Sequence, residues 1–127
     1  MDQHLIAYQR DDKPGIPFPN QWDLPGGGRE NGETPARCAL REVEEEFGLQ
    51  LSEDRIVWSR CYPAQNQKSR DSYFLALPLS TEEIDLVSFG DEGQRWKMMS
   101  FDEYLKHPNA VSFMQNRLRD FLDHVSS

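Results

Sequence analysis

The sequence has few cysteines, an excess of acidic over basic residues and no long apolar run, and each property excludes a class of protein. Cys38 and Cys61 are too few for a disulfide framework, so we expect a reducing, cytoplasmic setting. Lys and Arg number 14 against 22 Asp and Glu, and a net charge of −8 argues against a duplex nucleic-acid binder. With no apolar run of membrane-spanning length and no signal peptide, we expect no membrane association. The length predicts a single domain, residues 1–127.

Three of the eight glycines are consecutive, at positions 26–28. They precede the most charged segment of the chain, Arg41–Glu46, which reads Arg-Glu-Val-Glu-Glu-Glu. Thr34 is a suitable N-cap, and proline is well tolerated at the first helical position that follows it. Gly48 is a natural C-terminal stop. The pattern predicts a helix that begins at Pro35 and ends just before Gly48.

Three glutamates of this predicted helix, Glu42, Glu45 and Glu46, are spaced i, i+3 and i+4 and therefore share one face. Like charges at this spacing are mildly destabilising, which indicates that a cation binds there. Carboxylate oxygens suit Mg²⁺ or Mn²⁺, and no Cys/His pattern indicates zinc. The alternative is a solvated acidic face. The adjacent glycine loop favours a phosphate substrate bridged by metal.

The segment from Gly27 to Leu49 resembles the Nudix box of the Nudix hydrolases, G-x5-E-x7-R-E-U-x-E-E-x-G-U, where U is a bulky aliphatic residue. Residues 22–27 also resemble the family's usual approach to the box. The resemblance implies an α/β fold, an α/β/α sandwich around a mixed β-sheet. It also implies hydrolysis of a nucleoside diphosphate linked to another group. The defined positions are filled by Gly27, Glu33, Arg41, Glu42, Val43, Glu45, Glu46, Gly48 and Leu49.

The same resemblance assigns roles to single residues. Glu33 and Arg41 match the pair that braces the loop and helix through charge-assisted hydrogen bonds. The ion would neutralise phosphate charge, orient the pyrophosphate and activate water. The positions that match the family's metal ligands are Glu42, Glu45, Glu46 and the carbonyl of Gly26.

A second acidic loop, residues 90–94, contains Glu92, which matches a further metal-binding or base glutamate in many family members. An acid flanked by glycines is equally compatible with an ordinary turn. The general base is then Glu46 in the box or Glu92 on the loop, and we favour the box glutamate because it lies on a rigid helix. We expect direct attack by water, with no covalent intermediate, and a buried, non-catalytic Cys38.

Hydrophobic periodicity predicts the remaining elements. One departure from the family concerns the first strand, because members usually have an extra strand before it. Either that strand is missing, or another segment or subunit covers the exposed edge, which makes a homodimer an expected outcome. The predicted elements are strands at His4–Gln9, Ile56–Tyr62, Tyr73–Leu77 and Gln94–Met99, a short helix from a Ser100–Glu103 capping box to Lys106, and an amphipathic helix over Val111–Val125.

The substrate side is less well defined by the sequence. Phe18 and Trp22 flank the glycine loop and are candidates to stack on a base, and Arg29 is a candidate to contact phosphate. The polar segment 63–71 is the expected specificity loop. We therefore expect a Mg²⁺-dependent pyrophosphohydrolase of a nucleotide or nucleotide derivative. The alternative is a non-catalytic Nudix-like module that binds or senses a nucleotide.

Overall fold

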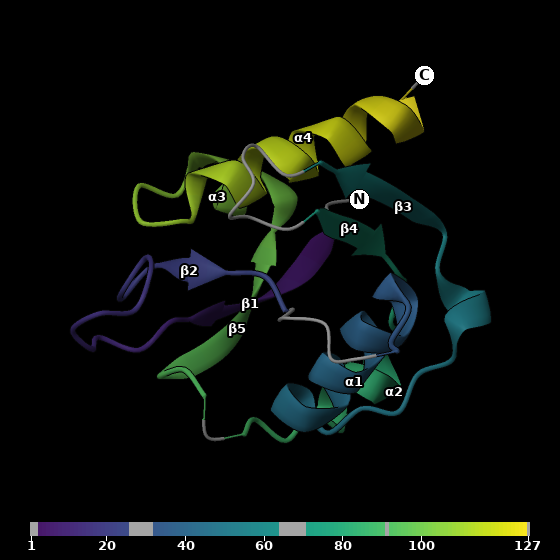
Figure 1. Cartoon of the computed structure of the whole chain (residues 1–127), viewed down its shortest axis with the longest axis horizontal. Coiled ribbons are helices and arrows are strands. Elements are labelled where there is room, and N and C mark those ends of the chain that lie inside the picture. The colour runs from purple at the N-terminus through teal and green to yellow at the C-terminus, as the bar shows by residue number, and fades with distance from the viewer. Residues whose placement is uncertain (1–2, 26–31, 64–70, 91, 127) are drawn as a thin grey trace. The chain divides into compact units, whose positions relative to one another are not determined.

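The structure is a computed structural model that describes residues 3–25, 32–63, 71–90 and 92–126 (Figure 1). The chain divides into two compact units, which we describe separately. Unit 1 consists of residues 1–25 and 88–127, and unit 2 consists of residues 26–87. The expectation of a single domain over 1–127 stays a prediction.

Unit 1 contains a three-stranded antiparallel sheet with the order β2-β1-β5. The central strand β1 (His4–Gln9) pairs along its whole length with β5 (Arg95–Ser100). The short strand β2 (Trp22–Asp23) pairs with the other side of β1, opposite Tyr8 and Gln9. Alternation along β1 directs successive side chains to opposite faces, and its last three residues are all buried.

The strand at His4–Gln9 is confirmed, but the expectation that its outer neighbour is absent holds only in part, because the edge opposite β5 is paired at Tyr8 and Gln9. β5 comes from far along the chain and pairs with one side, while β2, which the sequence analysis did not predict, pairs with the other. Among the described residues, β2 covers this edge only at Tyr8 and Gln9, so the argument from an exposed β1 edge to a homodimer is restricted to His4–Ala7. Self-association itself stays a prediction.

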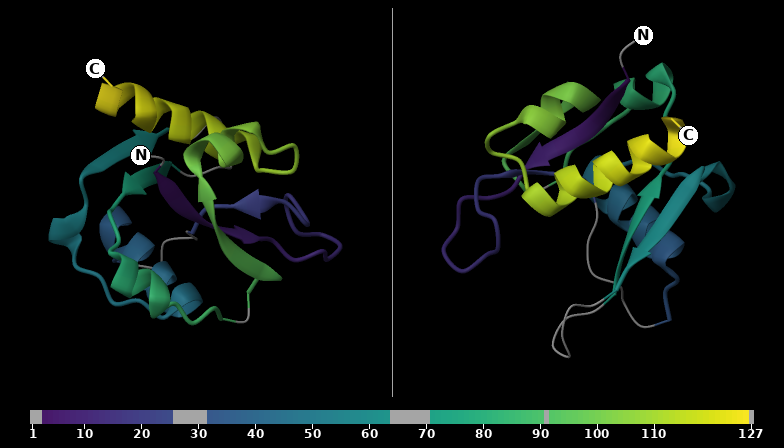
Figure 2. Two further views of the ribbon diagram at one scale, coloured as in Figure 1. Left: turned by 180° about the vertical axis from the view of Figure 1, so that it is seen from behind. Right: turned by 90° about the horizontal axis from the view of Figure 1, so that it is seen from above.

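Two helices complete unit 1, α3 (Phe101–Lys106) and α4 (Ser112–Ser126). The Ser100 hydroxyl accepts a hydrogen bond from the Glu103 amide at 3.0 Å, so the predicted cap is present. The helix α3 contacts both β5 and α4, and Figure 2 shows α4 in yellow from two further directions. The fully buried core side chains of this unit include Tyr104, Met99 and Val111.

Unit 2 contains the hairpin of β3 (Trp58–Tyr62) and β4 (Ser72–Ala76), which pair antiparallel from Trp58–Ala76 to Tyr62–Ser72. The helices α1 (Pro35–Phe47) and α2 (Thr81–Asp85) and a 3₁₀ turn, η1 (Glu53–Arg55), accompany this hairpin. The helix α1 contacts β4 and η1. The helix α2, which the sequence analysis missed, begins with a complete capping box of Ser80 and Glu83.

The box helix forms as predicted. The Thr34 hydroxyl accepts a hydrogen bond from the Arg37 amide at 3.2 Å, and Pro35 occupies the first position. Gly48 ends the helix with a φ of 70°, in the left-handed region that glycine adopts without steric cost. Cys38 and Phe47 are buried on the apolar face.

The α/β class is confirmed, but the strand directions differ from the prediction of a mixed sheet. Every strand pair among the described residues is antiparallel, and the parallel contact they contain is an isolated bridge between Trp22 and Ala110. The three-layer sandwich stays a prediction. Within the described ranges, no helix is long and apolar enough to cross a membrane.

Candidate active site

The helix α1 gives the three box glutamates very different environments. Glu46, near the helix end, is 6% exposed, although a carboxylate is rarely buried to this extent without polar or ionic partners. The side chain of Glu42, one turn earlier, is 13% exposed, whereas that of Glu45 is 58% exposed. Helical spacing thus produces a graded acidic face, with its least accessible carboxylate at Glu46.

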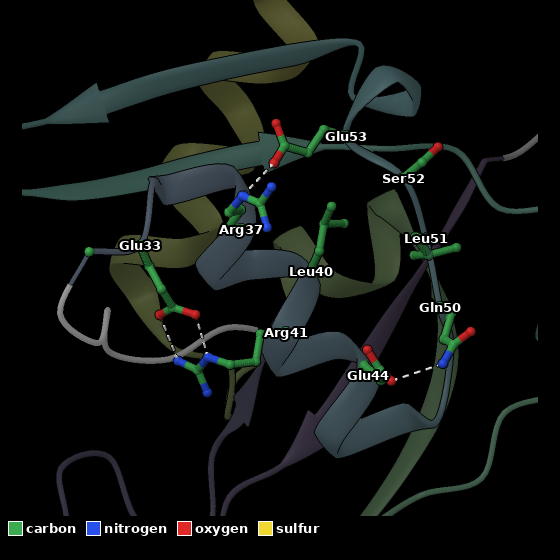
Figure 3. Close-up of a pocket in the computed structure, with 10 residues that line it drawn as sticks. Glu33, Arg37, Leu40, Arg41, Glu44, Gln50, Leu51, Ser52 and Glu53 are labelled. Carbon is green, nitrogen blue, oxygen red and sulfur yellow. Dashed lines mark hydrogen bonds and ion pairs between the residues drawn. The ribbon is translucent and has the colours of Figure 1, made fainter.

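Arg41 is the centre of the charged contacts on this helix. Its Nε donates to Glu33 Oε2 at 2.6 Å and its Nη2 donates to Glu33 Oε1 at 3.1 Å (Figure 3). Its Nη1 lies 3.0 Å from Glu42 Oε1 and 3.1 Å from Glu45 Oε2. One guanidinium therefore contacts three carboxylates.

The two-point pairing of Arg41 with Glu33 fixes the segment just before α1 against the helix. Fork-to-fork pairing of a guanidinium with a carboxylate fixes orientation as well as distance, because both partners are planar. Both side chains are shielded, at 23% exposure for Arg41 and 16% for Glu33, so solvent screens the pair less than an open surface pair. The contact that the resemblance implied between these residues is present.

The donor chemistry of this face fits a hard divalent cation, because Glu42, Glu45 and Glu46 offer carboxylate oxygens and two of them already converge on a positive charge. A complete cage is not preformed. Within residues 3–25, 32–63, 71–90 and 92–126, no three His, Cys, Asp or Glu side chains are grouped closely enough to hold a metal ion. Gly26, whose carbonyl is the remaining predicted ligand, lies outside the described residues.

A hollow of about 600 Å³ lies beside α1, between this helix and the segment that leads into η1 (Figure 3). Glu44 faces it and accepts a hydrogen bond from Gln50 Nε2 at 3.1 Å. Arg37 crosses its rim to reach Glu53 at 3.6 Å. None of the three box glutamates lines this hollow, so Glu44 lies on a different face of the helix from Glu42, Glu45 and Glu46.

Cys38 is buried, at 4% exposure, as predicted. Burial raises the pKa of its thiol above the usual value, and the negative charges of Glu33 and Glu42 raise it further, against the opposing charge of Arg41. The thiol therefore stays protonated at neutral pH, which is the unreactive form. Cys61, on β3, is exposed and has not formed a disulfide.

Comparison with known families decides the classification. The NUDIX domain model matches residues 1–121. The chain belongs to the NUDIX domain family. Its box, which the sequence analysis identified by resemblance, is the segment that carries Arg41 and its three carboxylate partners.

Individual Nudix relatives resemble the chain over different lengths. An uncharacterized Nudix hydrolase from Listeria innocua is 33% identical over 112 residues, which are 83% of this chain and 65% of that protein. A nucleoside triphosphatase, NudI, from Escherichia coli is 46% identical over 48 residues, or 38% of this chain and 33% of NudI. The chain thus spans less than two thirds of the length of either relative.

A solved structure shares the fold of this chain. It is a bifunctional NMN adenylyltransferase/ADP ribose pyrophosphatase from Francisella tularensis, complexed with AMP and a Mn ion. It matches with a TM-score of 0.70 and 20% identity, over 98% of this chain and 38% of that one. At this identity the likeness establishes the fold alone.

The remaining predicted site residues of this Nudix domain lie in unit 1 or outside the described residues. Glu92 is exposed, on the loop before β5, and belongs to unit 1, whereas the box glutamates belong to unit 2. Its neighbour Gly93 has a φ of 87°, and a Cβ there would come within 3.0 Å of the Gln9 carbonyl oxygen. Both the left-handed backbone conformation and the close approach to the Gln9 carbonyl therefore favour glycine at position 93, beside Glu92. Arg29 lies outside the described residues.

The two aromatic candidates differ in accessibility. Trp22 is 4% exposed, and its ring is covered by the Arg95 guanidinium at 5.2 Å and the Lys97 ammonium at 5.8 Å. Phe18 is 39% exposed, has a φ of 52°, and packs against Phe113 with 5.5 Å between ring centroids. Phe18 is therefore the accessible one of the two.

Sequence reasoning missed Gln9 and Arg95, which interact on the same face of the unit 1 sheet. Gln9 lies on the same face of β1 as Ala7, and it is only 9% exposed. A polar residue at a buried strand position usually has hydrogen-bond partners. A glutamine among the apolar residues of a predicted strand was therefore the sequence feature that could have indicated this interaction.

Proposed function

We propose that this Nudix domain catalyses Mg²⁺-dependent hydrolysis of a pyrophosphate bond in a nucleoside diphosphate linked to another group, by attack of water at phosphorus. The observation that carries the proposal is the box geometry. Glu42, Glu45 and Glu46 are gathered on α1, and Arg41 lies between two of them while it is held at two points by Glu33.

The residues that would hold the ion are Glu42 and Glu46, with Glu45 as the third donor. Bound Mg²⁺ supplies charge neutralisation, orientation of the pyrophosphate and a lower pKa for a coordinated water. Glu45 is 58% exposed and pairs with Arg41 through a single guanidinium nitrogen. It can therefore turn away from Arg41, while the Glu33 pairing keeps the guanidinium in place.

Glu46 is our candidate for the general base, and a carboxylate oxygen of this residue would accept the proton of the attacking water. Its 6% exposure limits competition from bulk water, and its position on a helix fixes its direction. Glu92 is the alternative base, on a loop whose backbone Gly93 holds in a left-handed conformation.

The relatives support the substrate class. NudI is named a nucleoside triphosphatase, and the Francisella protein, an ADP ribose pyrophosphatase in one of its two functions, was solved with AMP and a Mn ion. These names agree on nucleotides and on a divalent cation. They differ in the group that is attached to the nucleoside phosphate, so the proposal stops at a nucleotide or nucleotide derivative.

A substrate panel tests the proposal. Nucleoside triphosphates, nucleotide sugars, ADP-ribose and dinucleoside polyphosphates would each be incubated with Mg²⁺ and with EDTA, and phosphate-containing products measured. We expect Mg²⁺-dependent cleavage of at least one compound, with one oxygen-18 from labelled water in one phosphate-containing product. Nucleotide binding without turnover across the whole panel would support the sensing module instead.

A further inference from the structure

Three side chains form a row across the sheet of unit 1. Strand register places Gln9 opposite Trp22 of β2 on one side and opposite Arg95 of β5 on the other. Directly opposed residues in an antiparallel sheet direct their side chains to the same face. Trp22, Gln9 and Arg95 are therefore neighbours even though their positions in the sequence span 86 residues.

The side-chain amide oxygen of Gln9 accepts a hydrogen bond from Arg95. The Nε of Arg95 donates to Gln9 Oε1 at 2.9 Å. The other end of the Gln9 amide donates to the carbonyl oxygen and the side-chain oxygen of Asn20, at 3.1 and 3.0 Å. Gln94 Nε2 donates to the same Asn20 side-chain oxygen at 2.7 Å. Because both ends of the Gln9 amide are occupied, its oxygen stays directed at Arg95.

The guanidinium of Arg95 is oriented by stacking as well as by this hydrogen bond. It lies 5.2 Å from the centre of the Trp22 ring, a separation at which a cation is attracted to the ring face. Trp22 is itself only 4% exposed, and its carbonyl oxygen accepts a hydrogen bond from the Tyr104 hydroxyl at 3.1 Å. Side-chain entropy that Arg95 would lose on binding a ligand has thus largely been lost already.

Charge pairing around the unit 1 sheet leaves Arg95 as the exception. On the same face as Arg95, Lys97 pairs with Glu103 at 2.8 Å, and Asp23, on the opposite face, pairs with Arg10 at 3.0 Å. Arg95 is exposed and makes no ion pair in the described part of the chain, where its Nη1 and Nη2 groups also make no hydrogen bond. In a chain of net charge −8, an exposed arginine that a neutral partner holds through Nε, with no partner for Nη1 and Nη2 among the described residues, is suited to bind an anion.

We infer that Arg95 binds a phosphate group through the Nη1 and Nη2 groups of its guanidinium, and that Gln9 and Trp22 are the residues that position it. The fork matches the paired oxygens of a phosphate, for which arginine is the preferred side chain. The phosphate is that of the nucleotide substrate or free phosphate. Its assignment to the substrate rests on the proposed function, whereas the anion site itself does not.

Binding of inorganic pyrophosphate to the full chain in EDTA tests the site without metal or turnover. Titration calorimetry would compare the wild type with Arg95→Gln, Arg95→Lys and Gln9→Leu, with the fold of each variant checked by circular dichroism. The control is Arg119→Gln, which removes the same charge from α4 of the same unit. A second titration with inorganic phosphate would use the same variants.

We expect Arg95→Gln to weaken pyrophosphate binding about tenfold or more, the equivalent of one lost charge-assisted contact. Arg95→Lys should recover only part of it, since a point charge lacks the fork. Gln9→Leu, which keeps the Arg95 charge, should also weaken binding, while Arg119→Gln should change it less than twofold. No binding by the wild type, or equal effects of Arg95→Gln and Arg119→Gln, would overturn the inference.

Steady-state kinetics on a nucleotide that the panel identifies then separates the two phosphate sources. If the substrate phosphate is bound, Arg95→Gln should raise KM by a similar factor with kcat within about twofold, the pattern of lost uniform binding. An unchanged KM with weakened inorganic phosphate binding assigns the site to free phosphate. Failure of every panel substrate together with Arg95-dependent pyrophosphate binding would reject the proposed function and leave the anion site standing.

Discussion

Two arginines of this protein each donate a hydrogen bond from Nε to a neighbouring side chain but have opposite charge environments. The Nε of Arg41 donates to Glu33, and the Nε of Arg95 donates to Gln9, at 2.6 and 2.9 Å respectively. Around Arg41 there are three carboxylates, so the surplus charge is negative and suits a divalent cation. Arg95 is held by the neutral side-chain amide of Gln9, which orients the guanidinium without neutralising its charge, so that the charge can attract an anion.

The difference shows how the same type of side chain, arginine, can help to build a cation site in one place and an anion site in another. A charged partner strengthens each hydrogen bond but neutralises the guanidinium. A neutral partner contributes less binding energy but leaves the charge available to a ligand. We expect substitutions in the acidic environment of Arg41 to have the largest effects on turnover and stability, and substitution in an ordinary guanidinium pair to have the smallest.

The largest effect should come from the least exposed acid of the box. Glu46→Gln keeps the size of the side chain and removes both the ligand charge and the candidate base, so turnover should fall about 10²- to 10⁴-fold. Glu42→Gln and Glu45→Gln should also lower it by orders of magnitude. Initial rates on a substrate from the panel, with folding checked by circular dichroism, provide the measurement.

Glu44→Gln is the matched control for that series, because Glu44 is equally acidic, adjacent in sequence and directed to the hollow where it bonds Gln50. Its rate should stay within about twofold of the wild type. A loss of turnover comparable to that of Glu46→Gln would disprove the assignment of function to one face of α1.

Mg²⁺ should stabilise the wild type, because a ligand that binds only the folded state adds to the free energy of unfolding. At 100 times its dissociation constant the gain is about 2.7 kcal/mol. Melting scans with and without Mg²⁺ measure it, and Glu46→Gln should lose most of the shift. If Mg²⁺ does not change the melting temperature of the wild type, and EDTA does not reduce its activity, the acidic environment of Arg41 is not a cation site.

Substituting the two arginines that lie one turn apart on α1 separates a shielded pair from an open one. Arg41→Lys removes the two-point contact with Glu33 in a setting where both side chains are mostly covered, and should cost about 1 to 2 kcal/mol of unfolding free energy. Arg37→Lys, whose ion pair with Glu53 at 3.6 Å is exposed, should cost less than about 0.5 kcal/mol. Denaturant unfolding measures both, and equal losses would show that the Glu33 pairing adds no particular stability.

The same comparison explains how much the sequence could predict. The acidic face of α1 follows from local rules, because the cap at Thr34, the stop at Gly48 and the i, i+3, i+4 spacing all lie within one helix. The family resemblance rests on this same segment, and the contact of Glu33 with Arg41, only eight residues apart, was among its implications.

The environment of Arg95 could not be predicted in the same way. Its hydrogen bond to Gln9 joins residues 86 apart, and it depends on the pairing of β1 with β5 in one particular register. A shift of one residue would direct Gln9 to the opposite face. The two-residue strand β2 is also too short to give a periodic signal, and so the neighbours on both sides of β1 became known only from the structure.

A third guanidinium pair gives the smallest expected effect and tests whether pairing geometry alone marks a site. Arg55 bonds Glu83 at two points, with 2.6 Å from Nη2 to Oε1, and joins η1 to α2, outside the box. The Arg55 contact, with help from the Ser80 amide, lowers the pKa of Glu83 from 4.5 to about 2.

A carboxylate whose pKa is lower in the folded than in the unfolded state adds stability above its unfolded pKa, and that stability is lost as the pH falls. The melting advantage of the wild type over Glu83→Gln should therefore be constant above about pH 5, shrink between pH 4.5 and 2, and vanish below. Glutamine preserves the capping box, so the difference isolates the charge. Turnover of Glu83→Gln at neutral pH should match the wild type, since the pair lies outside the box; a large loss of turnover would extend the functional surface of unit 2 to α2.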